Sequence, residues 1–209
     1  PFRSKGIDQL PAGYRFEVGA DGSSHQWRFW DLRTISERPN DEAPAAFAGL
    51  FEDAVRLHMR SDVPVGVHLS GGMDSTSIIC ASSRVQSEAG ASGKLKAFSY
   101  ADTEYDESQY IDATLARTGI ELVTLKTDAN RVWEDLPRML RYQDEPVHSL
   151  TAVVGFQLMQ LTQEHGIRVI LNGQGADETL GGYPSYFRDG WDTFLIEGGL
   201  LPAGRDGGR

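Results

Sequence analysis

The chain has only one cysteine, Cys80, among its 209 residues. It therefore cannot form an internal disulfide, and we expect a reducing, cytoplasmic compartment. No apolar run approaches the roughly 20 residues that are needed to cross a bilayer, so no membrane partner is expected. The first residues, Pro1 to Lys5, do not resemble a signal peptide. Because an initiator methionine is also lacking, we expect the chain to begin inside a longer protein.

Basic residues are scarce relative to acidic ones. The sequence contains 20 Lys and Arg against 30 Asp and Glu, which gives a formal net charge of −10. The sequence also contains no run of Lys or Arg long enough to suggest a local basic patch. Sequence-independent nucleic-acid binding depends on neutralising backbone phosphates, so the composition argues against a nucleic-acid partner. The hydrophobic content of 40% suits one core domain with attachments.

The N-terminal part differs in pattern from the remainder. Short strands are predicted over 13–18 and 25–30, joined by a Gly- and Ser-containing connection, which is typical of a β-hairpin. This piece is too small to hold a core of its own. We therefore predict that residues 1–38 are the end of a preceding domain plus a linker.

From residue 39 onward, helical patterns alternate with apolar runs. The first helix begins near Asp41, with Phe47, Leu50, Phe51, Ala54 and His58 expected to face inward. The later helices are predicted over 76–88, 107–118, 130–142 and 151–165, and the strands over 63–69, 94–100, 120–125 and 167–171. In the helix over 107–118 we expect Tyr110, Ile111 and Leu115 to face inward and Gly119 to end the helix. Continuously apolar strands that alternate with helices indicate a doubly wound, Rossmann-like parallel sheet covered on both faces, hence the α/β class. We assign residues 39–195 to this domain and 196–209 to a loose tail.

The first apolar strand runs directly into the segment Ser70-Gly71-Gly72-Met73-Asp74-Ser75. Two adjacent glycines let the backbone turn tightly and approach a ligand closely. Successive N–H groups, the two serine hydroxyls and the start of a helix can form a concave set of hydrogen-bond donors. This arrangement predicts a polyphosphate site.

The fourth strand runs into a second glycine-rich segment, Asn172-Gly173-Gln174-Gly175-Ala176-Asp177-Glu178. In an open parallel sheet, ligands bind beyond the carboxyl ends of the strands. Asp74 and Asp177 would then repel a polyphosphate unless Mg²⁺ lay between them, and Mg²⁺ prefers a few carboxylates plus phosphate oxygens. The two loops together predict a metal–nucleotide site, with Asp74 and Asp177 as the metal ligands.

The sequence has no Walker A motif and no complete Gly-x-Gly-x-x-Gly fingerprint, and the absence of a loop lysine argues against γ-phosphate transfer.

Ser70-Gly-Gly-Met-Asp-Ser75 resembles the pyrophosphate loop of ATP pyrophosphatases, which split ATP into AMP and pyrophosphate. The second segment, followed by Gly181-Gly182-Tyr183, is similar to glutamine-hydrolysing asparagine synthetase, as is Asp144-Glu145-Pro146. Residues 6–13 and Trp30-Asp31 resemble the end of that family's glutaminase domain. The resemblance covers roughly residues 1 to 190.

The resemblance implies an adenine nucleotide alpha-hydrolase-like fold that binds ATP and Mg²⁺. It implies that aspartate is activated as β-aspartyl-AMP, that pyrophosphate is released, and that ammonia from glutamine then forms asparagine. It also allows a homodimer through a glutaminase domain. The nucleotide would be held by His68, Ser70, Gly71, Gly72, Asp74, Ser75, Tyr100, Asn172 and Gly173.

The chain departs from the family at several points. Many relatives have Glu at the position of Gln174, where it is proposed to act as a base, and Gln cannot take a proton. His68 replaces a commoner Leu. The N-terminal Cys nucleophile of the glutaminase is absent, as are the late Lys-bearing helices. Tyr183, Tyr186, Phe187 and Trp191 could line the substrate pocket, but we expect them to pack against those helices.

The sequence leaves two alternative functions open. One is an amide ligase that keeps the adenylation chemistry and changes the acceptor, of the β-lactam synthetase or lasso-peptide cyclase type. The other is an inactive fragment that binds nucleotide weakly.

Overall fold

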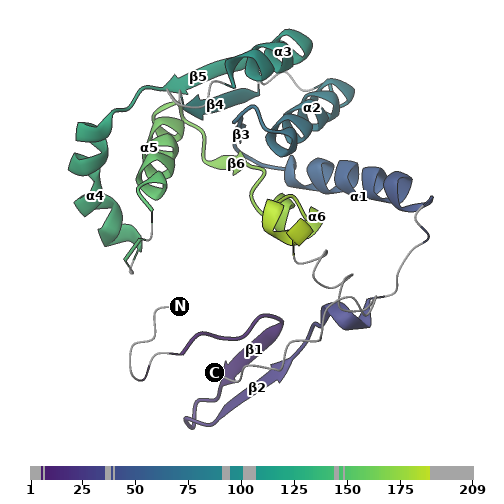
Figure 1. Cartoon of the computed structure of the whole chain (residues 1–209), viewed down its shortest axis with the longest axis vertical. Helices are drawn as coiled ribbons and strands as arrows, with labels where there is room; N and C mark the ends of the chain where they lie inside the picture. The colour runs from purple at the N-terminus through teal and green to yellow at the C-terminus, as the bar shows by residue number, and fades with distance from the viewer. Residues whose placement is uncertain are drawn as a thin grey trace. The chain divides into compact units, whose positions relative to one another are not determined.

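The computed structural model of the chain describes residues 6, 8–35, 39, 41–90, 95–100, 107–143, 146–147 and 149–188. Its helices and strands follow the chain in the order shown in Figure 1: β1 (Tyr14–Val18), β2 (Ser24–Arg28), the 3₁₀ helix η1 (Leu32–Thr34), α1 (Ala43–His58), β3 (Val65–His68), α2 (Met73–Glu88), β4 (Lys96–Tyr100), α3 (Ser108–Thr118), β5 (Glu121–Leu125), α4 (Ala129–Gln143), α5 (Thr151–Glu164), β6 (Val169–Leu171) and α6 (Ala176–Leu180).

The chain separates into two compact units, residues Pro1–Gly49 and Leu50–Arg209. In the first unit, β1 and β2 pair antiparallel with Tyr14 opposite Arg28, which confirms the predicted hairpin. Asp31 follows β2 and accepts hydrogen bonds from the backbone and the guanidinium of Arg33. The division falls inside α1, whereas the sequence places the boundary at residue 38. The assignment of these residues to domains stays a prediction.

The second unit is built on a four-stranded sheet in the order β5-β4-β3-β6. Every pairing is parallel: Gly66 lies opposite Lys96 on one side and Ile170 on the other, and Lys96 lies opposite Glu121. The chain builds outward from β3 to β5 and then returns to place β6 on the other side of β3. The switch in direction between β3 and β6 is where open α/β sheets bind ligands.

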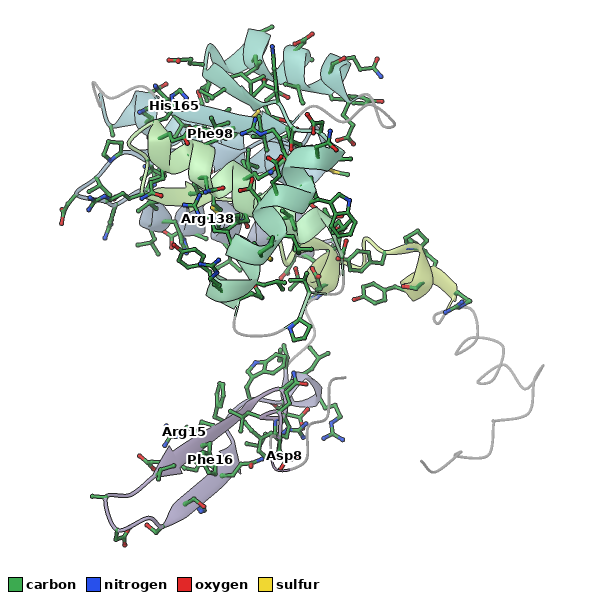
Figure 2. The ribbon with its side chains drawn as sticks, turned by 90° about the vertical axis from the view of Figure 1, so that its left-hand side faces the viewer. Asp8, Arg15, Phe16, Phe98, Arg138 and His165 are labelled. Carbon is green, nitrogen blue, oxygen red and sulfur yellow. The ribbon has the colours of Figure 1, made fainter. Side chains whose placement is uncertain are left out.

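Helices cover both faces of this sheet, which confirms the predicted doubly wound α/β class (Figure 1). On one face, Val67, Leu69 and Ala97 pack with Ile79 of α2, and α3 adds Ile111 and Leu115. On the other face, Phe98 and Leu125 pack with Leu158 of α5. The ring of His165, just after α5, stands edge-on to Phe98 with centroids 5.8 Å apart (Figure 2). Within the described residues, no helix combines the length and the apolar character needed to cross a membrane.

The predicted inward face of α1 is confirmed at Phe51 and wrong at the other four residues, which are exposed. Phe47 and Leu50 are 49% and 67% exposed, whereas Val55 is buried. Phe51, Val55 and Met59 form the buried stripe because they follow an i, i+4, i+8 row that packs on Ala81 and Val85 of α2. Arg56 reinforces the same helix pair, since its guanidinium lies 2.8 Å from the Glu88 carboxylate. Sequence periodicity alone could not tell this stripe from the neighbouring one.

Two other expectations also need correction. We expect Tyr110 to face inward from α3, but it is 57% exposed, because the neighbouring Ile111 and Leu115 pack against the sheet instead. The helix after the first glycine loop begins at Met73 instead of Thr76, so Asp74 and Ser75 lie in its first turn. Gly119 ends α3 in the left-handed conformation, with φ of 66°, as the pattern predicts.

Candidate functional site

The two glycine loops leave neighbouring strands at the same edge of the sheet. β3 ends at His68 and β6 at Leu171, and the two strands pair directly. A Cβ atom on Gly173 would lie 2.9 Å from Asp74 Cβ and 3.2 Å from the backbone nitrogen of Ser75. The loops are therefore in van der Waals contact, and only a residue without a side chain fits at Gly173.

The loop after β3, residues 70–75, is held by its own serines. Ser75 Oγ accepts from the backbone N–H of Ser70 at 3.2 Å and donates to the Gly72 carbonyl at 3.1 Å. Ser70 Oγ lies 3.1 Å from Ser75 Oγ and accepts from the Gly72 N–H at 3.2 Å. The N-cap of α2, Gly72, has no side chain to satisfy the first N–H groups of the helix. These donors are thus available to an anion, and the helix dipole favours one there.

An open pocket of about 570 Å³ lies over this edge of the sheet. It is lined by nearly all of the residues that the sequence singles out: His68, Ser70, Gly72, Asp74, Ser75, Tyr100, Asn172, Gly173, Gln174 and Asp177. Gly71 lies next to the pocket without lining it. It adopts φ of +92°, and a Cβ there would lie 2.8 Å from Glu107 Cβ. The structure therefore brings the predicted residues together at one site, while their individual roles stay predictions.

The side chains that line the pocket are acidic on balance. Three carboxylates line it, from Asp74, Asp177 and Glu178, and none of the described lining residues is Lys or Arg. Tyr183 donates a hydrogen bond to Glu178 Oε1 at 2.9 Å, and this bond raises the pKa of the tyrosine hydroxyl. An anionic ligand in this pocket would meet net repulsion from the side chains unless it brought a cation with it.

His68 combines a polar ring with burial at the end of β3. Its Nε2 atom is buried and has no hydrogen-bond partner among the described residues. Burial lowers the pKa of the imidazole below its usual value of 6.5, because the charged form loses its hydration. The ring is therefore neutral at pH 7.

The free energy of unfolding is expected to fall between pH 7 and pH 5 partly through His68. As pH drops below about 6.5 the unfolded chain takes up the proton first, so stability present above that pH is lost as pH falls through the folded-state pKa. Urea unfolding at both pH values should show a smaller loss for His68→Leu than for the wild type, by at most about 1.4 kcal/mol per pH unit. His58→Leu removes an exposed histidine and is the control. An unchanged pH dependence in His68→Leu would contradict this account.

Sequence reasoning missed the wall of the pocket that α5 provides. Thr151, Val154, Gly155 and Leu158 line it, and a helix that precedes a parallel strand starts at the carboxyl edge of the sheet, which is the signal that could have found them. Tyr183 also lines the pocket, although we expected it to pack elsewhere. The short helix α6, bracketed by the left-handed Gly175 and Gly181, lies in the segment that the sequence predicts as a loop. The motif residues Asp144 and Glu145 lie outside the described residues.

Comparison with known proteins gives the family. The asparagine synthase family profile matches residues 46–201. The asparagine synthetase [glutamine-hydrolyzing] 1 of Bacillus subtilis (strain 168) is 34% identical over 134 residues, which is 64% of this chain and 20% of that protein. The asparagine synthetase B [glutamine-hydrolyzing] of Escherichia coli (strain K12) is 26% identical over 85% of this chain and 34% of that protein. The chain thus spans only about a fifth to a third of the length of these curated relatives.

A more distant relative and one solved structure are also similar. The amidase chry2 of Gibberella zeae is 24% identical over 88% of this chain and 30% of that protein. A glutamine-dependent NAD+ synthetase from Acinetobacter baumannii, solved with ADP, has a TM-score of 0.45 and 18% identity over 78% of this chain and 32% of that chain. The profile match covers well over half of the 209 residues. On that match, the chain belongs to the asparagine synthase family.

Proposed function

We propose that the chain binds Mg-ATP in the pocket beside β3 and β6 and serves in the adenylation of a carboxylic acid, followed by amide formation with ammonia. The observation that carries the proposal is the arrangement of the loop over residues 70–75. It presents N–H donors at the start of α2, in contact with a second loop that carries a carboxylate. Family membership supports the same chemistry.

The residues present fit a magnesium ion that arrives with its nucleotide. Within the described part of the chain, no group of three or more His, Cys, Asp and Glu side chains could hold a metal by itself. Asp74 and Asp177 nevertheless line one pocket, on loops that touch. Mg²⁺ usually binds through one or two carboxylates plus phosphate oxygens and water, so this donor set suits it. When bound, the ion would neutralise charge on the phosphate oxygens.

The reaction needs alignment more than a protein nucleophile. A substrate carboxylate oxygen would bond to the α-phosphorus of ATP as the bond to the β-phosphate oxygen breaks, which releases pyrophosphate. The N–H groups at the start of α2 would hold the departing pyrophosphate. Ammonia would then bond to the acyl carbon and lose a proton as AMP leaves. Gln174 lines the pocket and can orient a substrate by hydrogen bonds, but its amide cannot accept that proton.

We propose aspartate as the acid and glutamine as the ammonia source. The names of the Bacillus and Escherichia relatives describe glutamine-hydrolysing asparagine synthetases, and their similarity to this chain supports both assignments. A β-lactam synthetase or lasso-peptide cyclase type of ligase would keep the same pocket and differ in the acid.

Pyrophosphate release from Mg-ATP is expected to rise at least tenfold when aspartate is added with an ammonium salt. The reason is that adenylation consumes ATP only when a carboxylate is in line with the α-phosphorus. A coupled pyrophosphate assay measures this, and Asp74→Ala, which removes a proposed metal ligand, should abolish it. Release driven by another carboxylic acid and not by aspartate would favour the alternative ligases.

A further inference from the structure

A glycine lies in the interior of α5, where it does not stabilise the helix. Gly155 is the fifth residue of Thr151–Glu164, in regular helical conformation. A Cβ atom there would have no heavy atom within 4 Å, so no close packing requires its absence. Glycine is the least favourable residue in a helix interior after proline. Neither backbone conformation nor packing within the chain accounts for it.

Gly155 faces the nucleotide pocket, which it lines with its helical neighbours Thr151, Val154 and Leu158. This wall is largely apolar, and Phe98 and Tyr100 of β4 also line the pocket. Asp177 and Glu178, which also line the pocket, belong to the separate helix α6. The pocket therefore combines carboxylates that suit a metal and phosphates with an apolar α5 wall that suits a flat ring.

We propose that Gly155 is a specificity-determining position whose missing side chain holds open the space for the nucleoside part of the nucleotide. The inference depends on the proposed function. With the pyrophosphate end held at residues 70–75, the ribose and base must extend from this loop into the rest of the pocket. The base has apolar faces and α5 contributes apolar side chains to the pocket lining, so a side chain at position 155 would occupy the volume that the base needs.

The test compares two probes on the whole 209-residue chain. Mg-ATP fills both the phosphate and the nucleoside space, whereas magnesium pyrophosphate fills only the phosphate space. In calorimetric titrations, Gly155→Ala is expected to weaken Mg-ATP binding at least threefold and Gly155→Leu at least tenfold. Neither should change pyrophosphate affinity. Gly155→Ala should at the same time raise Tm by about 2–4 °C, because alanine favours the helix.

Gly49 provides the matched control. It also lies in a helix interior, that of α1, with no heavy atom within 4 Å of a Cβ, but it does not line the pocket. Gly49→Ala and Gly49→Leu should leave Mg-ATP affinity unchanged, and Gly49→Ala should raise Tm to a similar extent.

The outcomes separate the two proposals. If the wild type does not bind Mg-ATP, the proposed function fails and this inference fails with it. If the wild type binds and Gly155→Leu binds equally well, only the inference is overturned. Equal losses of Mg-ATP and pyrophosphate affinity would overturn it too, since the nucleoside space would not be what changed. Should Gly155→Leu not fold, an unchanged Mg-ATP affinity in Gly155→Ala overturns the inference.

Discussion

ATP is expected to bind this chain only together with a divalent cation, and Asp74→Ala is expected to weaken Mg-ATP binding about 100-fold. The pocket has three carboxylates and no described Lys or Arg to offset them. A polyphosphate without a metal would meet like charges at short range. Removing one close charged partner typically costs about 2–5 kcal/mol of binding free energy, and a factor of 100 corresponds to about 2.7 kcal/mol.

Calorimetric titration with ATP in the presence of Mg²⁺ and in the presence of EDTA measures this dependence directly. Asp112→Ala is a suitable control, because it removes an exposed carboxylate from α3 that does not line the pocket. The control should bind Mg-ATP like the wild type. Equal binding of ATP with and without Mg²⁺ would show that the carboxylates do not act through a metal.

Gly71→Ala is expected to lower the free energy of unfolding by about 2–4 kcal/mol, since two costs combine. Gly71 has φ of +92°, a conformation that L side chains rarely adopt. Its Cβ would in addition lie 2.8 Å from Glu107 Cβ and 3.2 Å from the Glu107 carbonyl oxygen. The carbonyl belongs to the backbone at the start of α3, so it cannot move aside as a flexible side chain would. The adjacent loop should shift, and Mg-ATP affinity should fall as well.

Urea unfolding of Gly90→Ala separates these two costs. Gly90 also has a positive φ, of +60°, but a Cβ there would have no heavy atom within 4 Å. It should therefore lose only about 1–2 kcal/mol, the conformational part alone. If the two variants lost equal stability, the contact between Gly71 and Glu107 would not contribute.

Much of the fold follows from local sequence patterns. The predicted strands and helices of the second unit match the observed ones to within a few residues, because runs of apolar residues and helical periods are local signals. The loop over residues 70–75 was predicted as a donor-rich turn from its glycines and serines alone. The sequence did not predict that α2 begins inside this loop, at Met73. Helix boundaries depend on hydrogen bonds that a sequence pattern does not show.

The sequence by itself determined that two glycine loops carrying carboxylates follow apolar strands in an α/β chain. Only the tertiary structure decided that these strands are neighbours, through the pairing of β3 with β6, and that Gly173 touches Asp74. Strand order and the choice of Val55 over Leu50 for the core depend on contacts between segments far apart in the chain. The α5 wall and the open space at Gly155 also depend on such long-range contacts. A local sequence pattern does not record these contacts, because the same periodicity would be seen whichever segment packed against these residues.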